Sequence, residues 1–181
     1  MHAAGLLPLH GSSTIAAQFG PPPVSDFTMR LSDYLRSDFV LVGLEANDVE
    51  SVVHAVAECA EQADLGDSTR VLEKLLERER AHPTVIGEGL AIPHATVPGL
   101  SEVVIGIALP TDPIVYGAPD ADPVRAFFVL LSPPGSERLH VKLLARICRL
   151  VRHGDLIPLL EKAESGAEVV TIIQSEDDLH P

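Results

Sequence analysis

Aromatic side chains are scarce in this sequence of 181 residues, which contains no Trp, 2 Tyr and 5 Phe. Single-strand nucleic-acid binders stack bases on aromatic rings, and aromatic cages use such rings to enclose cationic ligands. Basic side chains are also few, because 13 Lys and Arg stand against 26 Asp and Glu and leave a formal net charge of -13. We therefore expect no nucleic-acid partner, since a chain of this charge repels polyphosphate.

Cysteines and long apolar runs are equally rare. Cys59 and Cys148 lie far apart, outside any metal-binding or disulfide spacing, and we expect both to be small buried apolar side chains in a reduced, cytoplasmic protein. No run of about 18 apolar residues occurs, so direct membrane insertion is not predicted. Gly87 and Gly89 lack the third glycine and the preceding strand of a dinucleotide loop, and no Walker, nucleophile-elbow or HExxH signature is present. We expect neither a cofactor nor a metal.

The chain divides into a short extension and one domain. Residues 1–28 hold no Lys or Arg, include the triplet Pro21–Pro23 and show no apolar periodicity, so we expect a flexible N-terminal extension. Periodic sequence begins at Met29. With 46% hydrophobic residues in the chain, residues 29–181 can bury the core of a single domain.

Two amphipathic helices are predicted in the first half of this domain. The first follows a short apolar strand over 39–44, and Asn47 can cap it while Glu50 reaches back three residues later. Asp67 or Ser68 can cap the second helix. Both segments repeat apolar residues at the three- and four-residue spacing of a helix with one buried face.

Two apolar runs, Val103–Leu109 and Val124–Leu131, are typical of strands covered on both faces. The preceding segment over 82–97 shows no periodicity, and its prolines and glycines predict an ordered but irregular path. A helix is predicted over 136–152, and two shorter helical patterns close the chain. Helices that alternate with a few buried strands indicate the α/β class, with helices on both sides of one sheet.

Histidine is the side chain in this sequence with the clearest capacity for catalysis, and the sequence contains eight. His94 follows Pro93, whose ring restricts the backbone, inside the irregular segment. His140 lies in the first turns of a predicted helix, where the helix start disfavours the imidazolium form. The two rings could face each other at the end of the sheet, one as a nucleophile and the other as a hydrogen-bond donor. Residue chemistry alone leaves open that both are ordinary structural residues.

The residues around His94 form the most specific motif in the chain. Segments 75–79 (LLERE) and 84–94 (TVIGEGLAIPH) resemble the type-2 enzyme IIA family of the bacterial phosphoenolpyruvate phosphotransferase system, the fructose, mannitol and nitrogen-regulatory group. The resemblance extends from Arg30 to about Glu176 and includes the helix that carries His140. The sequence departs from the family pattern at Val85, where glycine is usual, and over 80–83.

This resemblance implies a three-layer α/β/α sandwich with one mixed sheet, and phosphorylation of His94. It implies that His140 stabilises the phosphoryl oxygens or the incoming group through its ring N–H. Arg78 would offset phosphoryl charge or orient the loop, with an exposed helix-end cation as the alternative, and Thr84 would donate a hydroxyl hydrogen bond. No metal is required of such a carrier, because phosphoryl transfer between imidazoles depends on alignment and charge stabilisation.

The resemblance also implies the partners. The donor would be the histidine-containing phosphocarrier protein, and an acidic acceptor would attract a donor with basic residues around its histidine. Downstream, an enzyme IIB domain would accept the group, or regulated target proteins would bind. Five basic residues of the predicted His140 helix could form a docking face or merely a solvated one: Arg138, Lys142, Arg146, Arg149 and Arg152.

A competing hypothesis is a non-catalytic protein-interaction module on the same scaffold, as in the cytoplasmic domains of anion transporters. The presence of both His94 and His140 argues against it. The residues leave the sugar, the choice between transport and regulation, and the oligomeric state open.

Overall fold

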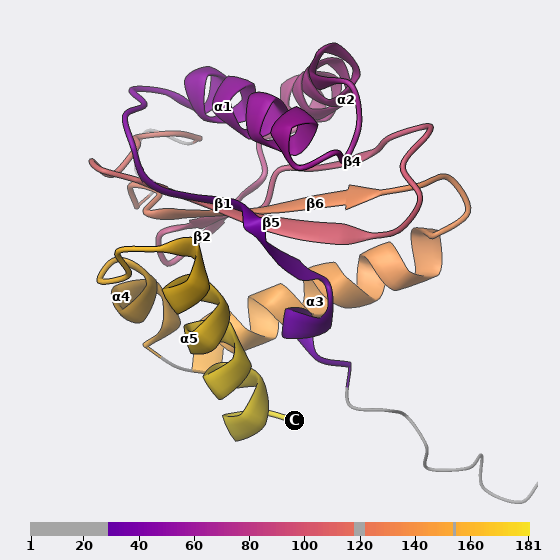
Figure 1. The fold of residues 1–181 in the computed structure, drawn as a ribbon. Helices are drawn as coiled ribbons and strands as arrows, with labels where there is room; N and C mark the ends of the chain where they lie inside the picture. Colours follow the sequence, from indigo (N-terminus) through magenta and orange to yellow (C-terminus); the bar gives the residue numbers. More distant parts are fainter. Residues whose placement is uncertain (1–28, 118–121, 154) are drawn as a thin grey trace, which may run out of the picture.

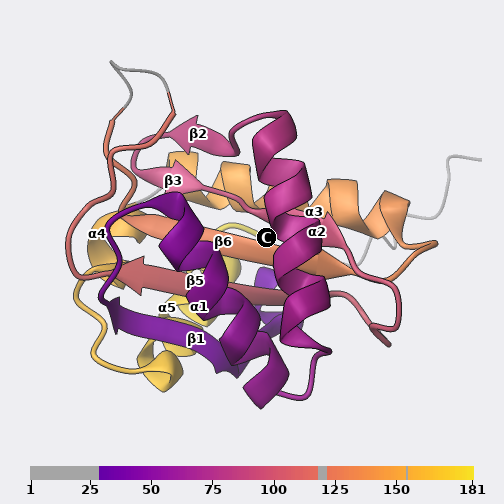
Figure 2. The same cartoon turned by 90° about the horizontal axis from the view of Figure 1, so that it is seen from above.

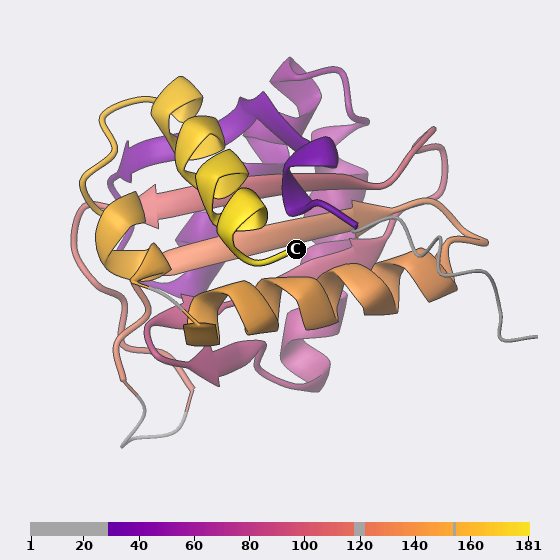
Figure 3. The ribbon, with the colours of Figure 1, turned by 90° about the horizontal axis from the view of Figure 1, so that it is seen from below.

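One mixed, six-stranded sheet lies between two layers of helices (Figure 1). The computed structural model describes residues 29–117, 122–153 and 155–181, so the extension predicted over 1–28 lies outside the described residues. One face of the sheet is covered by α1 (Val49–Gln62) and α2 (Ser68–Ala81). The other face is covered by η1 (Leu31–Asp33), α3 (Glu137–His153), α4 (Leu156–Leu160) and α5 (Gly166–Leu179) (Figure 3). The expected three-layer α/β/α architecture is confirmed.

Three long strands form the centre of the sheet: β1 (Leu35–Leu44), β5 (Val104–Pro110) and β6 (Ala126–Ser132). Strand β5 lies between the other two, parallel to β1 and antiparallel to β6 (Figure 2). Every residue of β6 is buried, because helices cover both of its faces. The apolar runs predicted to be strands therefore do form strands, with ends displaced by one or two residues.

The segment over 82–97 contains three short strands, so the expectation of an irregular path was wrong. They are β2 (Val85–Gly87), β3 (Leu90–Ala91) and β4 (His94–Thr96). Strands β3 and β4 pair in parallel with successive parts of β6, while β2 forms a hairpin with β3 and leads directly into the two glycines. Strands of two or three residues are too short to show a periodic pattern, and Pro93 interrupts the run. His94 thus begins a strand.

The hairpin between β2 and β3 turns through Glu88 and Gly89, which both have positive φ, at 55° and 77°. Positive φ at both central residues is the requirement of a type I′ turn, whose twist matches that of the flanking strands. The carbonyl of Gly89 accepts hydrogen bonds from the backbone N–H groups of Arg125 and Ala126, at 2.8 and 3.0 Å. These bonds fasten the hairpin to the start of β6 and so fix the path of the chain toward His94.

Two separate apolar cores lie on the two faces of the sheet. Side chains of β6 alternate between them, with Phe127, Val129 and Leu131 under α1 and α2, and Phe128 and Leu130 under the opposite helices. This alternation is the period of two that a strand imposes. It turns consecutive residues of the paired strand β4 to opposite faces in the same way.

The helix caps differ slightly from the expectation. Asp48, rather than Asn47, caps α1: its side chain accepts from the backbone N–H of Ser51 at 2.7 Å, and the Ser51 hydroxyl lies 3.2 Å from the Asp48 nitrogen. Ser51 therefore takes the place expected of Glu50, because a serine at the third helical position can complete the reciprocal box. Asp67 caps α2, with its carboxylate 2.9 Å from the backbone nitrogen of Arg70.

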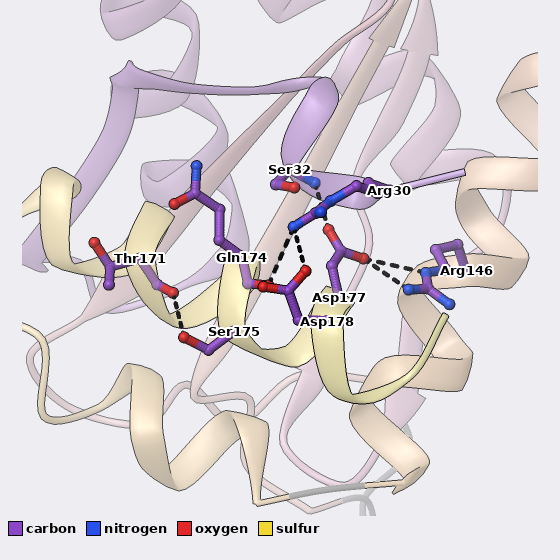
Figure 4. A network of polar contacts seen from close by, with 8 residues as sticks. All are labelled: Arg30, Ser32, Arg146, Thr171, Gln174, Ser175, Asp177 and Asp178. Atoms are coloured by element: carbon purple, nitrogen blue, oxygen red, sulfur yellow. Dashed lines mark hydrogen bonds and ion pairs between the residues drawn. The ribbon is translucent and has the colours of Figure 1, made fainter. Parts of the chain in front are cut away.

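The Arg146 side chain is buried, so its inclusion in the predicted docking face was wrong. It is 3% exposed and pairs with Asp177 of α5, which is 2% exposed, at 2.8 Å (Figure 4). The other oxygen of Asp177 accepts from the backbone N–H of Ser32 at 2.8 Å. Position 146 follows the buried Leu143 by three residues, so the helix turns it toward the core.

Both cysteines are free thiols on helices. Cys59 is buried as expected, whereas Cys148 is only half-buried because it lies at the edge of the buried face of α3. Burial raises the pKa of both thiols, which keeps them in the unreactive protonated form. Within the described ranges, no helix is long and apolar enough to cross a bilayer.

Candidate functional site

His94 and His140 lie against each other at one end of the sheet. Their ring centroids are 5.2 Å apart and their planes meet at 65°, an edge-to-face arrangement. His94 comes from β4 and His140 from the first turn of α3, where its backbone N–H bonds to the Ser136 carbonyl at 2.9 Å. Both rings line an open groove of about 450 Å³, together with Arg78 from the last turn of α2.

Strand β6 determines where His94 lies. The Leu130 backbone N–H donates to the Pro93 carbonyl at 3.0 Å, and His94 pairs in register with Leu130. The next residue, Ala95, belongs to the core beneath α1 and α2. Because consecutive strand residues point to opposite faces, the His94 ring is turned toward the α3 side, where His140 is.

The two ring nitrogens of His94 have different partners. Nδ1 lies 2.7 Å from the carbonyl oxygen of Ile92, and Nε2 lies 3.0 Å from Nε of Arg78. A carbonyl can only accept and a guanidinium N–H can only donate, so Nδ1 carries the proton and Nε2 carries the lone pair. Burial lowers the pKa of His94, and the positive charge of Arg78 lowers it further, although the bond to Ile92 opposes them. The ring is therefore held neutral with its nucleophilic nitrogen at Nε2.

Arg78 is part of this arrangement rather than a free cation at the helix end. Its Nη1 donates to the carbonyl of His82 at 2.8 Å while its Nε donates to His94. The half-buried guanidinium thus bridges the end of α2 and the histidine. A cation held at this position suits an anion that arrives at the Nε2 atom.

The structure does not bring Thr84 into the groove. Thr84 is 4% exposed, and both its backbone N–H and its hydroxyl donate to the carboxylate of Glu79 at 2.7 Å. Glu79 itself is buried, in the series of buried positions that Val71 and Leu75 begin on α2. Sequence reasoning did not assign Glu79 a role, although its four-residue spacing from Leu75 is a detectable signal of burial.

His140 has a buried partner that sequence reasoning also missed. Its Nδ1 lies 2.7 Å from the hydroxyl oxygen of Ser132, the last residue of β6, which is 1% exposed. Burial lowers the pKa of His140, and the neighbouring His94 and Arg78 lower it further. The available signal was a hydroxyl residue that directly follows the apolar run and precedes Pro133.

The rim of the groove carries one ion pair, between Lys74 and Glu77 of α2 at 2.7 Å. Ala81, Ala95 and Thr96 complete the lining. In the part of the chain that the structure describes, no group of three His, Cys, Asp or Glu side chains is arranged to hold a metal ion. The groove therefore offers a nucleophilic imidazole, a second neutral imidazole and a guanidinium to a small anion.

Comparison with known proteins identifies the family. The family model described as phosphoenolpyruvate-dependent sugar phosphotransferase system, EIIA 2, matches residues 33–176. A nitrogen regulatory protein of Bradyrhizobium diazoefficiens is 30% identical over 145 residues, which are 80% of this chain and 95% of that protein.

Two solved structures share the fold. Nitrogen regulatory protein IIA-Ntr from Neisseria meningitidis is 23% identical with a TM-score of 0.72, over 79% of this chain and 98% of that one. Mannitol enzyme IIA of Escherichia coli, determined in complex with phosphorylated mannitol enzyme IIB, is 16% identical with a TM-score of 0.66, over 78% of this chain and 99% of its own. The extent of the family match, with the histidine pair in its groove, shows that this chain belongs to the EIIA type-2 family of the phosphoenolpyruvate-dependent sugar phosphotransferase system.

Proposed function

We propose that this protein is a cytoplasmic phosphohistidine carrier in which His94 accepts a phosphoryl group from the histidine-containing phosphocarrier protein. It then passes the group to an enzyme IIB domain or uses it as a regulatory signal. One observation carries the proposal: the neutral His94 ring, anchored at Nδ1 by Ile92, keeps its lone pair on Nε2 at the groove. The similarity to a nitrogen regulatory protein supports the regulatory role, but family membership alone is equally compatible with sugar transport.

The transfer step balances without a metal or an external base. The Nε2 lone pair of His94 attacks phosphorus as the P–N bond to the donor's imidazole breaks, and the donor ring keeps that electron pair. The proton on Nδ1 stays in place, where the Ile92 carbonyl stabilises the positive charge that develops on the ring. No proton has to leave His94 before or during the transfer.

Arg78 has two successive tasks in this proposal. In the unphosphorylated structure the Nε–H of Arg78 donates a hydrogen bond to the lone pair on Nε2 of His94, so the guanidinium must shift when the phosphoryl group approaches. It then pairs with the phosphoryl oxygens and neutralises part of their charge.

His140 and Thr84 support the carrier in different ways. His140 donates a ring N–H to the phosphoryl group, across a separation of 5.2 Å between the ring centroids. Thr84 acts indirectly, because its hydroxyl is occupied by Glu79. The bonds between these two residues hold the start of β2 against the last turns of α2, and so keep Arg78 in position.

Docking is proposed to depend on charge. The net charge of -13 attracts a phosphocarrier with basic residues around its histidine. The exposed cations of α3 remain available for a downstream partner, once Arg146 is excluded: Arg138, Lys142, Arg149 and Arg152. Electrostatic contacts of this kind affect the association rate more than the affinity.

The test is intact mass after incubation with phosphoenolpyruvate, the general phosphotransferase enzyme and the phosphocarrier. The wild type should gain one acid-labile phosphoryl group, and the His94→Ala variant should gain none. His54→Ala, which removes an exposed histidine on α1, is the matched control and should still be phosphorylated.

Two outcomes would contradict the proposal. A His94→Ala protein that still gains the phosphoryl group would show that another histidine is the acceptor. A wild type with no gain would favour the alternative of an interaction module without phosphotransfer.

The His140→Ala variant should accept the group but pass it on slowly, and unchanged onward transfer would refute its assigned role.

A further inference from the structure

The hydroxyl of Ser132 has a single hydrogen-bond partner in the described part of the chain. The oxygen of this buried side chain lies 2.7 Å from Nδ1 of His140, and the structure gives it no other hydrogen-bond partner there. A buried hydroxyl without an acceptor is destabilising, so the proton is expected to go to the available one. Nδ1 of His140 must then carry a lone pair.

This assignment fixes the tautomer of His140. A neutral imidazole has one N–H, so when Nδ1 accepts, Nε2 is protonated. His94 has the opposite tautomer, because its Nδ1 faces the Ile92 carbonyl, which cannot donate. Two chemically identical rings thus have opposite functions at Nε2: a lone pair on His94 and a donor N–H on His140.

Strand β6 orients both rings. His94 pairs in register with Leu130, and two residues later Ser132 bonds to His140. The backbone of Ser132 is itself fixed, because its carbonyl accepts from the N–H of Val97 at 2.8 Å. The serine side chain therefore projects from an anchored backbone on the strand that also positions the nucleophile.

We propose that Ser132 is a positioning residue that holds His140 as the Nε2–H tautomer, so that His140 presents a donor and not a second lone pair to the phosphoryl group on His94. With Nδ1 directed at the buried serine, Nε2 is the ring nitrogen left for the groove that His140 lines. The opposite tautomer would place a lone pair against the phosphoryl oxygens, which repel it. The part that concerns phosphoryl oxygens rests on the proposed carrier function, whereas the tautomer does not.

The tautomer is tested on the unphosphorylated full-length protein by long-range ¹H–¹⁵N correlation spectra at a pH where both rings are neutral. In the wild type, Nε2 of His140 should be protonated and Nδ1 should not, with the reverse pattern for His94. Ser132→Ala should remove the preference at His140 and leave His94 unchanged, while Ser132→Thr, which restores a hydroxyl, should return it. A wild-type His140 protonated at Nδ1, or a Ser132→Ala spectrum identical to wild type, would overturn the proposal.

Transfer kinetics supply the second readout. Ser132→Ala should still take up one phosphoryl group, but onward transfer should slow about five- to tenfold, the effect expected for one misdirected hydrogen bond. Ser101→Ala, at an exposed serine, is the matched control and should transfer normally. Unchanged transfer in Ser132→Ala would contradict the role of the serine. A wild type that takes up no phosphoryl group would instead refute the carrier function and leave the tautomer result intact.

Discussion

At the residue scale, the two histidines of the groove differ in the neighbour that orients each ring. A backbone carbonyl faces Nδ1 of His94, and a serine hydroxyl faces Nδ1 of His140. Burial disfavours the charged form of both rings. A nucleophile that is neutral near physiological pH needs no base to activate it.

We predict that both histidines titrate below the ordinary histidine pKa of about 6.5. Desolvation lowers the pKa of each ring, and the charge of Arg78 adds to the effect, while Glu137 opposes it at His140. Arg78→Gln should therefore raise the pKa of His94. Ring-proton NMR shifts followed against pH measure these values directly, and a His94 pKa that falls in the variant would contradict the assigned cause.

The same pKa shifts predict a loss of stability in acid. Between the lowered folded-state pKa values and about 6.5, the unfolded chain binds more protons than the folded chain, so the free energy of unfolding falls as the pH is lowered through this window. Replacement of His94 and His140 by Gln should flatten that part of the profile, as measured by urea unfolding at several pH values. An unchanged slope in the double variant would show that the loss has another source.

The sequence revealed the site only as far as the motif extends. His94, His140 and Arg78 could be found because they match a family pattern, and the structure brings these three together. The roles of Glu79, which lies in the same motif, and of Ser132 could not be found, since each acts through a partner that is set by the packing of α2 on β2 or of α3 on β6. Such pairings depend on spatial register, which a single sequence does not display.

At the element scale, the C-terminal helix α5 is fastened to both η1 and α3 through one carboxylate. Asp177 accepts from Arg146 and from the backbone of Ser32, and a second, exposed pair joins Arg30 to Asp178 at 2.8 Å (Figure 4). Burial opposes ionisation of Asp177, but the bonds from Ser32 and Arg146 outweigh it and lower the pKa of the carboxyl. The helix that carries His140 therefore depends on an ion pair outside the groove.

We predict that Asp177→Ala destabilises the protein by about 3–5 kcal/mol, because it leaves the buried Arg146 charge without a partner. Asp178→Ala removes an exposed partner of Arg30 and should cost under about 1 kcal/mol. Urea unfolding of the two variants tests the contrast. Equal losses in the two proteins would mean that the buried pair contributes no more than a surface one.

The longer elements were predictable from their own patterns, except that β1, expected over 39–44, already begins at Leu35. The starts of both amphipathic helices of the first half, and both ends of the apolar strands β5 and β6, were expected within one or two residues of their observed positions. The three strands of 85–96 were missed, because segments so short are defined by their pairing, of β3 and β4 with β6 and of β2 with β3, rather than by their own pattern. The cap of α1 was displaced by one residue for a similar reason, since either Asn47 or Asp48 satisfies the local signal.

At the scale of the whole molecule, charge is unevenly distributed. The chain has a net charge of -13, yet α3 carries four exposed cations and a single carboxylate, that of Glu137. Within the described residues, none of these four cations takes part in an ion pair. The acidic remainder and the basic helix face therefore suit partners of opposite charge, which matches a carrier that meets a donor and an acceptor in turn.

We predict that phosphoryl uptake from a basic phosphocarrier slows as salt concentration rises, because screening weakens long-range attraction. Glu77→Lys, on the rim of the groove, should slow uptake more than Glu58→Lys, an exposed position on α1. Both effects are measured as the rate of phosphoryl uptake, from reactions quenched at successive times at several salt concentrations. Rates that are independent of salt, or equally affected by the two variants, would exclude electrostatic steering at the groove.

The most direct measurement of the central claim is the position of phosphorus on the phosphorylated protein, read from phosphorus–nitrogen couplings in ¹⁵N- and ³¹P-resolved NMR spectra. We predict a single phosphoryl group bonded to Nε2 of His94, with Nδ1 of the same ring still protonated and bonded to the Ile92 carbonyl. Phosphorus on Nδ1 of His94, or on any other histidine, would contradict the account.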